Sequence, residues 1–143
     1  MATITDAKLV VTHDHEKKLV RPVVTCKVHF TDLEQCLMKT CARTRLFKLK
    51  CELWGEDSGL TGSDDKLWTY TPVKYYPDPT PTATESVTFV VMPDPPGVLG
   101  EGVLDEDGFL GGYVDEVYGK LTLTNLFSLV RITKKTNVVS HRF

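Results

Sequence analysis

The chain has 143 residues, a formal net charge of −2 and 41% hydrophobic residues, a composition typical of a globular protein. This length fits one domain with its own hydrophobic core, because domains cluster near about 100–150 residues. A net charge this small gives no overall positive field that would attract nucleic acid, although a local basic face is compatible with it. We therefore expect a single domain over residues 1–143 that binds no nucleic acid.

The N-terminal segment carries no recognisable targeting signal. MATITDAKLV lacks the basic stretch followed by a long apolar stretch that marks a signal peptide. No apolar run in the chain approaches the roughly 18 residues of a membrane span, so we expect no membrane insertion. These features leave the cellular compartment open.

Alternation of apolar and polar residues dominates the first half of the chain and predicts strands with one buried face. Residues 2–12 form a weak strand candidate, and residues 24–30 form a clear one. Residues 32–41, DLEQCLMKTC, instead carry apolar side chains three and four positions apart, which indicates a short helix, with a loop as the alternative. Residues 47–54 give a second clear strand.

The second half of the chain continues the same alternation. Residues 87–91 and 120–124 are clear strands, and residues 66–75, 128–134 and 136–141 are weaker candidates. Proline-rich stretches separate several of these segments, because proline fixes φ and lacks a hydrogen-bond donor. About seven or eight short strands predict an all-β fold, an antiparallel β-sandwich with one short helix.

The residues in the apolar phase of the clear strands should form the core of this sandwich. They are Val24, Cys26, Val28, Phe30, Phe47, Leu49, Leu53, Val87, Phe89, Leu121 and Leu123. The glycine-rich segment 97–114 should be a long loop region between strands.

Two acidic segments contain candidate metal ligands. Asp57 lies in GEDSGLTGSDD, and Asp105, Asp107 and Asp115 lie in LDEDGFLGGYVDE. The segment D-E-D-G followed by D-E-V-Y-G-K-L-T-L resembles the third loop and following strand of C2 domains, and FKLKCELWGEDSG resembles a C2 strand that enters an acidic loop. The resemblance implies calcium as a candidate ligand, since Ca²⁺ prefers several carboxylate oxygens on flexible loops. Solvated acidic turns are the alternative interpretation.

Tyr118 provides a second resemblance. It follows Asp115 by three residues and precedes a strand, and this arrangement is similar to the tyrosine corner of immunoglobulin-like sandwiches. In that motif the phenol bonds to an upstream backbone group. The resemblance implies a fold and no activity, because such sandwiches serve many functions.

Histidine and cysteine are the other residue types that could bind metal. His13 and His15 lie on one face of a strand through THDHE and could share an ion, but the sequence identifies no third ligand. A solvent-exposed strand edge is therefore the preferred interpretation. The four cysteines include no CxxC pair, and Cys26 and Cys51 lie in the apolar phase of strands, so we expect free thiols.

The chain shows no catalytic signature. No serine lies in a GxSxG context, and no glycine-rich loop matches a phosphate-binding loop, so we expect no enzyme. Four aromatic residues are candidate partner contacts: Trp54, Trp68, Tyr70 and Phe143. Exposed aromatic rings are favoured at protein interfaces, although they could instead cover a second buried face.

These observations predict a non-enzymatic interaction or structural subunit without an obligatory cofactor. It would assemble into a homo-oligomer through the strand-like terminal segments, or dock a protein partner. The alternative is a calcium-dependent lipid- or carbohydrate-binding module, as the C2 resemblance implies.

Overall fold

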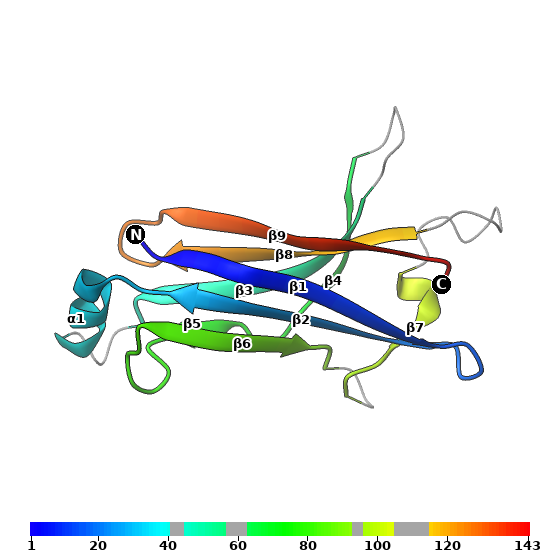
Figure 1. The fold of residues 1–143 in the computed structure, drawn as a ribbon, viewed down its shortest axis with the longest axis horizontal. Helices are drawn as coiled ribbons and strands as arrows, with labels where there is room; N and C mark the ends of the chain where they lie inside the picture. The colour runs from blue at the N-terminus through cyan, green and yellow to red at the C-terminus, as the bar shows by residue number, and fades with distance from the viewer. Residues whose placement is uncertain (41–44, 57–62, 93–95, 105–114) are drawn as a thin grey trace.

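The fold consists of two antiparallel sheets packed face to face around a hydrophobic core (Figure 1). The computed structural model describes residues 1–40, 45–56, 63–92, 96–104 and 115–143. Its elements in chain order are β1 (Thr3–Asp14), β2 (Leu19–His29), α1 (Asp32–Thr40), β3 (Phe47–Gly55), β4 (Asp65–Thr69), β5 (Lys74–Tyr76), β6 (Thr84–Val90), β7 (Leu99–Gly100), a 3-10 helix (Glu101–Val103), β8 (Asp115–Asn125) and β9 (Arg131–His141). The all-β sandwich predicted from the sequence is confirmed.

The first sheet has the strand order β1-β2-β6. Strand β6 pairs with the C-terminal part of β2, and β7 pairs with its first two residues. The second sheet has the order β4-β3-β8-β9, and β5 shares the β4 side of β3. The strands β1 and β9 are edges of different sheets, yet they lie side by side and run in the same direction (Figure 1). One side of the sandwich is therefore nearly closed by the first and last strands.

The core follows the alternation of the sequence. Strand β3 shows the rule, with Leu49, Cys51 and Leu53 fully buried and Lys48 and Lys50 on the opposite face. All of the residues predicted for the core are buried. Burial of so much apolar area is the main stabilising contribution to the fold.

Between the helix and the loop considered for residues 32–41, the structure has a helix, α1, over Asp32–Thr40. Its first turn has a capping box, in which the Glu34 amide donates to Thr31 Oγ1 at 3.2 Å and the Thr31 amide donates to Glu34 Oε2 at 2.8 Å. Within the described ranges, no helix is long and apolar enough to cross a bilayer.

Two weaker strand predictions differ from the structure. The segment 66–75 forms two strands, β4 and β5, because the turn around Pro72 interrupts it. Of the segments 128–134 and 136–141, residues 131–141 form one continuous strand, β9, with a bulge between Lys135 and Val138, whereas residues 128–130 belong to the β8–β9 turn.

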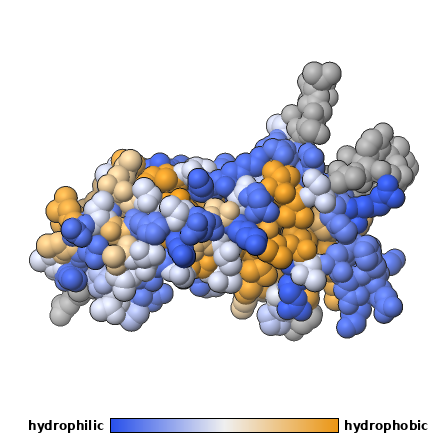
Figure 2. Space-filling model, in the orientation of Figure 1, coloured by the Kyte–Doolittle hydropathy of each residue, from blue (hydrophilic) through white to orange (hydrophobic). Residues whose placement is uncertain are grey.

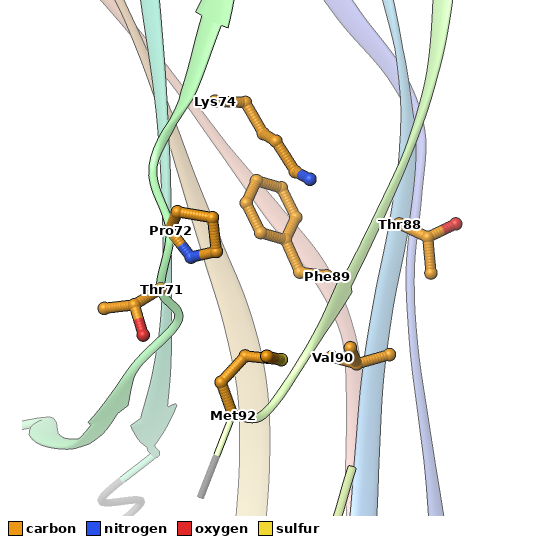
Figure 3. Close-up of a pocket in the computed structure, with 7 residues that line it drawn as sticks. All are labelled: Thr71, Pro72, Lys74, Thr88, Phe89, Val90 and Met92. Carbon is orange, nitrogen blue, oxygen red and sulfur yellow. The ribbon is translucent and has the colours of Figure 1, made fainter. Parts of the chain in front are cut away.

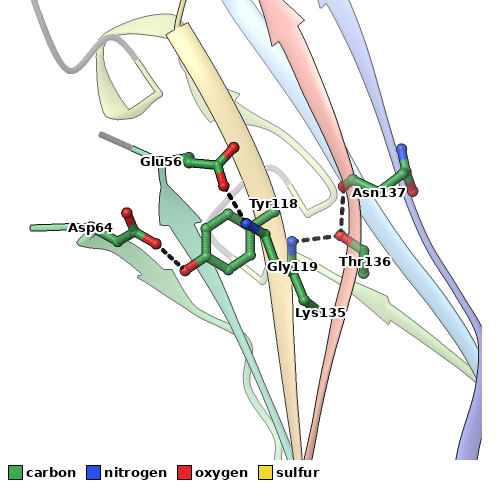
Figure 4. A network of polar contacts seen from close by, with 7 residues as sticks. All are labelled: Glu56, Asp64, Tyr118, Gly119, Lys135, Thr136 and Asn137. Atoms are coloured by element: carbon green, nitrogen blue, oxygen red, sulfur yellow. Dashed lines mark hydrogen bonds and ion pairs between the residues drawn. The ribbon is translucent and has the colours of Figure 1, made fainter. Parts of the chain in front are cut away.

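This bulge is held by hydrogen bonds among Gly119, Thr136 and Asn137 (Figure 4), and Asn137 also connects it to the first sheet. It inserts an extra residue opposite Gly119, whose amide donates to Thr136 Oγ1 at 2.8 Å. A Cβ on Gly119 would lie 2.9 Å from Val24 Cγ2, so only glycine fits there without displacement. The next residue, Asn137, accepts from the Leu9 amide at 2.8 Å and donates to the Leu9 carbonyl at 3.0 Å. The side-chain amide of Asn137 thus forms with the Leu9 backbone the two hydrogen bonds that a neighbouring strand would form in a sheet.

Candidate functional site

The outer face of the second sheet is rich in lysine and arginine. Strand pairing arranges these residues in rows, with Lys48 beside Thr124 and Thr124 beside Arg131. The next row contains Lys50, Thr122 and Thr133. Long cationic side chains on β3 and β9 therefore flank short threonines on the central strand β8.

This difference in side-chain length creates a surface groove of about 430 Å³ along β8. The groove is lined by Lys48, Lys50, Glu52, Lys120, Thr122, Thr124, Leu126, Arg131 and Thr133. Four cations face one carboxylate in a chain whose net charge is −2. The groove is thus a local positive region, which attracts anionic groups.

The single carboxylate of the groove is already paired. Glu52 is 6% exposed and lies 3.2 Å from Lys50 Nζ and 3.7 Å from Lys66 Nζ. By contrast, Lys48 and Arg131 form no ion pair within the described part of the chain. These two cations, one on each side of β8, can accept a new anionic partner.

The aromatic rings on this face are covered by cations of the same chain. Lys120 Nζ lies 4.8 Å from the Trp54 ring centroid, and Lys135 Nζ lies 3.9 Å from that of Tyr118. Such cation–π contacts are favourable and occupy the ring face. The predicted partner residue Trp54 therefore lies beside the groove, but its ring is not an open stacking surface.

The other predicted partner residues lie elsewhere. Trp68 is half-buried and packs against the core. Tyr70 is fully buried, and its hydroxyl donates to the Pro22 carbonyl at 3.0 Å, so the prediction of an exposed Tyr70 is wrong. Burial raises the pKa of its phenol. Trp68 and Tyr70 do share a phase of the chain, but this phase faces the core.

Phe143 also packs against residues of its own chain. Its ring is partly buried against the core cluster and lies 5.7 Å from the His13 ring centroid. The structure thus gives this terminal ring an intramolecular partner, where the sequence suggested a neighbouring subunit.

Of the predicted calcium ligands, Asp57, Asp105 and Asp107 lie outside the described residues. Asp115 is 4% exposed at the start of β8. The convergence of these aspartates on one ion stays a prediction.

The tyrosine corner predicted at Tyr118 differs from the structure. The Tyr118 hydroxyl donates to Asp64 Oδ2 at 2.7 Å, a side-chain acceptor in place of the expected backbone group (Figure 4). Burial and this hydrogen bond raise the pKa of the phenol. The motif that suggested an immunoglobulin-like corner is thus a link between β8 and the start of β4.

The three cysteines of the described residues, Cys26, Cys36 and Cys51, are free, as predicted for them. Burial raises the pKa of Cys26 to about 11 and raises that of Cys51 further. Both buried thiols are therefore protonated at neutral pH and are poor nucleophiles.

Sequence reasoning missed the third member of a histidine cluster. His141, at the end of β9, lies with His13 and His15, and one ring nitrogen of each falls within 4.8 Å of the others. Glu101 lies 2.9 Å from His13 Nε2. The only signal in the sequence was a histidine in the last strand candidate, because no local spacing connects residues so far apart.

A pocket of about 100 Å³ opens between β6 and the turn around Pro72 (Figure 3). Pro72 and Phe89 face each other across it, and Met92 covers one end. This volume is well below the roughly 300 Å³ of typical small-molecule sites, so the pocket does not define a ligand.

Hydrophobic side chains also reach the surface (Figure 2). Val10 pairs with Val23 and Val23 with Val90 across the first sheet, and Val10 and Val90 are 48% and 40% exposed. In the β8–β9 turn, Phe127 and Leu129 are 64% and 71% exposed. Exposed apolar groups of this kind are common at protein interfaces.

The sequence matches no protein-family model and no curated protein.

Proposed function

We propose that this chain is a non-enzymatic interaction module whose basic groove docks an extended acidic segment of a protein partner. The observation that carries the proposal is the groove of four cations and one paired carboxylate on a chain of negative net charge. Complementary charge of this kind speeds association and selects the partner.

The shape of the groove favours a single extended strand of the partner. Its floor follows β8 from Lys120 to Thr124, which corresponds to about 14 Å at roughly 3.4 Å per residue. Lys48 and Arg131 stand on opposite sides of this floor and can bind carboxylates from both directions. The threonine hydroxyls between them can donate hydrogen bonds to the same groups.

Other ligand classes fit less well. Binding of sugars or single-stranded nucleic acid commonly depends on open aromatic faces, whereas the rings of Trp54 and Tyr118 are covered by Lys120 and Lys135. An anionic membrane is a planar partner, and half-buried lysines in a concave groove are less accessible to it than to a narrow peptide. Charge and shape together support an acidic protein segment.

The proposal is tested by fluorescence anisotropy with a labelled oligoglutamate peptide at low salt. The double variant Lys48→Gln/Arg131→Gln should lower the affinity about ten-fold, because each exposed charge pair contributes up to about 1 kcal/mol. Glu52→Gln should raise the affinity a few-fold, because it removes the carboxylate that competes for Lys50.

The matched control is Lys8→Gln/Lys134→Gln, which removes the same charge. Lys8 lies in the first sheet, and Lys134 pairs with the inward-facing Leu121, so neither lines the groove. The control should change the affinity less than two-fold. Equal losses in both double variants would overturn the proposal, as would binding to anionic vesicles without binding to the peptide.

Light scattering on the full chain, with and without calcium, tests the alternatives from the sequence. A monomer that binds the peptide supports docking of a foreign partner. A stable homo-oligomer whose interface blocks the groove would overturn the proposal in favour of self-assembly.

A further inference from the structure

A cluster of three histidines, His13, His15 and His141, lies where β1 and β9 end. Asn137 bonds to Leu9, and the two strands run in the same direction, so advancing four residues along each brings His13 beside His141. The ring nitrogens His13 Nδ1 and His141 Nε2 are 3.0 Å apart. The His15 ring, two residues after His13, lies against the His13 ring in a tilted arrangement, with ring centroids 3.8 Å apart. Three imidazoles from both ends of the chain thus converge on one point.

Glu101 determines which nitrogen of His13 is available. Its Oε2 lies 2.9 Å from His13 Nε2, and the His13 side chain is only 6% exposed. A carboxylate at this distance accepts a hydrogen bond from the Nε2–H group, so the Nδ1 atom carries the lone pair and faces His141 Nε2. A carboxylate that orients one ring nitrogen, while the other nitrogen keeps its lone pair, is the usual surrounding of a metal-binding histidine.

An aromatic ring, that of Phe143, packs beside the histidine cluster. The Phe143 ring lies 5.0 Å from the His141 ring centroid and 5.7 Å from that of His13. An apolar ring here shields one side of the cluster from water, while His15 is exposed on another side. An ion could enter on the His15 side.

We infer that His13, His15 and His141 form a site for a divalent transition-metal ion of the zinc type, with Glu101 as the positioning residue of His13. Three imidazole nitrogens suit Zn²⁺, Ni²⁺ and Cu²⁺ and do not suit Ca²⁺ or Mg²⁺, which prefer oxygen. Ligand nitrogens about 2.0–2.1 Å from a tetrahedral ion lie about 3.4 Å apart. The longest separation, 4.8 Å, therefore has to shorten by about 1.4 Å, which the exposed His15 ring can provide, and the 3.0 Å separation of His13 and His141 has to widen slightly.

The site would join the two sheets at their shared edge. His13 belongs to β1 of the first sheet and His141 to β9 of the second. Three protein ligands leave the fourth tetrahedral position for water or a partner side chain. The inference does not depend on the basic groove, because the two sites share no residue.

The test is a titration of the untagged full chain with Zn²⁺, followed by calorimetry and by NMR of the histidine rings. The chain has four histidines, so His29, which bonds to Thr5 and Thr84, is a built-in reference. We expect one ion per chain and shifts of the His13, His15 and His141 resonances, with His29 unchanged. Equal effects on all four rings would overturn the inference.

Variants separate ligation from folding. His15→Asn alters an exposed ring and should weaken Zn²⁺ binding at least ten-fold while the circular dichroism spectrum stays unchanged. Glu101→Gln should weaken it about 10- to 100-fold, the usual effect of removing such a carboxylate. His29→Asn and Cys36→Ser are the controls and should bind like the wild type. Loss of binding in Cys36→Ser, or full binding in His15→Asn, would refute the assignment.

Discussion

The substitution Thr136→Val tests whether the bulge in β9 stabilises the sandwich through its hydroxyl group. Valine keeps the shape of threonine but leaves the buried Gly119 amide without its 2.8 Å acceptor. A buried donor without a partner costs about 1–3 kcal/mol, and the lost bond from Thr136 Oγ1 to the Asn137 carbonyl adds about 1 kcal/mol. We therefore expect the free energy of unfolding to fall by about 2–4 kcal/mol.

Thr136→Ser is the matched comparison. Serine keeps both hydrogen bonds and loses the methyl group that fills the space beside Gly119, at a cost of about 1 kcal/mol. Urea denaturation of the two variants and the wild type measures the difference. The reasoning is refuted if Thr136→Val is as stable as Thr136→Ser, because the hydroxyl would then contribute nothing that the methyl group does not.

Three further outcomes follow from the packing and the buried thiols. Leu49→Ala should lower the free energy of unfolding by about 2–5 kcal/mol in urea, because a fully buried side chain leaves a cavity. Asn137→Ala should lower it by about 1–2 kcal/mol and speed hydrogen exchange at the Leu9 amide, because both hydrogen bonds to Leu9 are lost; an unchanged exchange rate would contradict this. Burial raises the pKa of Cys26 from 9.0 to about 11, so the contribution of this thiol to stability should be constant below pH 9 and fall between pH 9 and 11, where the unfolded thiol ionises and the folded one does not. Cys26→Ala should reduce this alkaline loss in pH-dependent thermal melts.

The sequence predicted the core because burial on one face is a local property of a strand. Leu49 and Leu121 alternate with polar residues whatever strands lie beside them, so their burial needs no knowledge of topology. In the segment 66–75, the sequence places Tyr70 in the same phase as Trp68, opposite Leu67, and this alternation alone does not show which of the two phases faces the core. The burial of Tyr70 depends on the division of this segment at Pro72 and on contact with the other sheet at Pro22.

The groove and the histidine cluster depend on pairing between distant segments. The polar phase of Lys48 and Lys50 was visible in the sequence, but their position opposite Arg131 depends on the register of three strands. Likewise, His141 joins His13 only because β1 and β9 are adjacent edges. Such arrangements come from chain topology, which residue spacing does not determine.

The adjacency of β1 and β9 has a consequence for folding kinetics. The hydrogen bonds between Leu9 and Asn137 join residues 128 positions apart. Contacts of such long range slow the folding of β-sandwiches, because the entropy of closing the loop is lost before the contact forms. Until β9 has paired with β8, the outer edge of β1 has no neighbour and can pair with a strand of another chain. Mutations that delay β9, such as those in its bulge, should therefore increase aggregation during refolding more than their effect on final stability suggests.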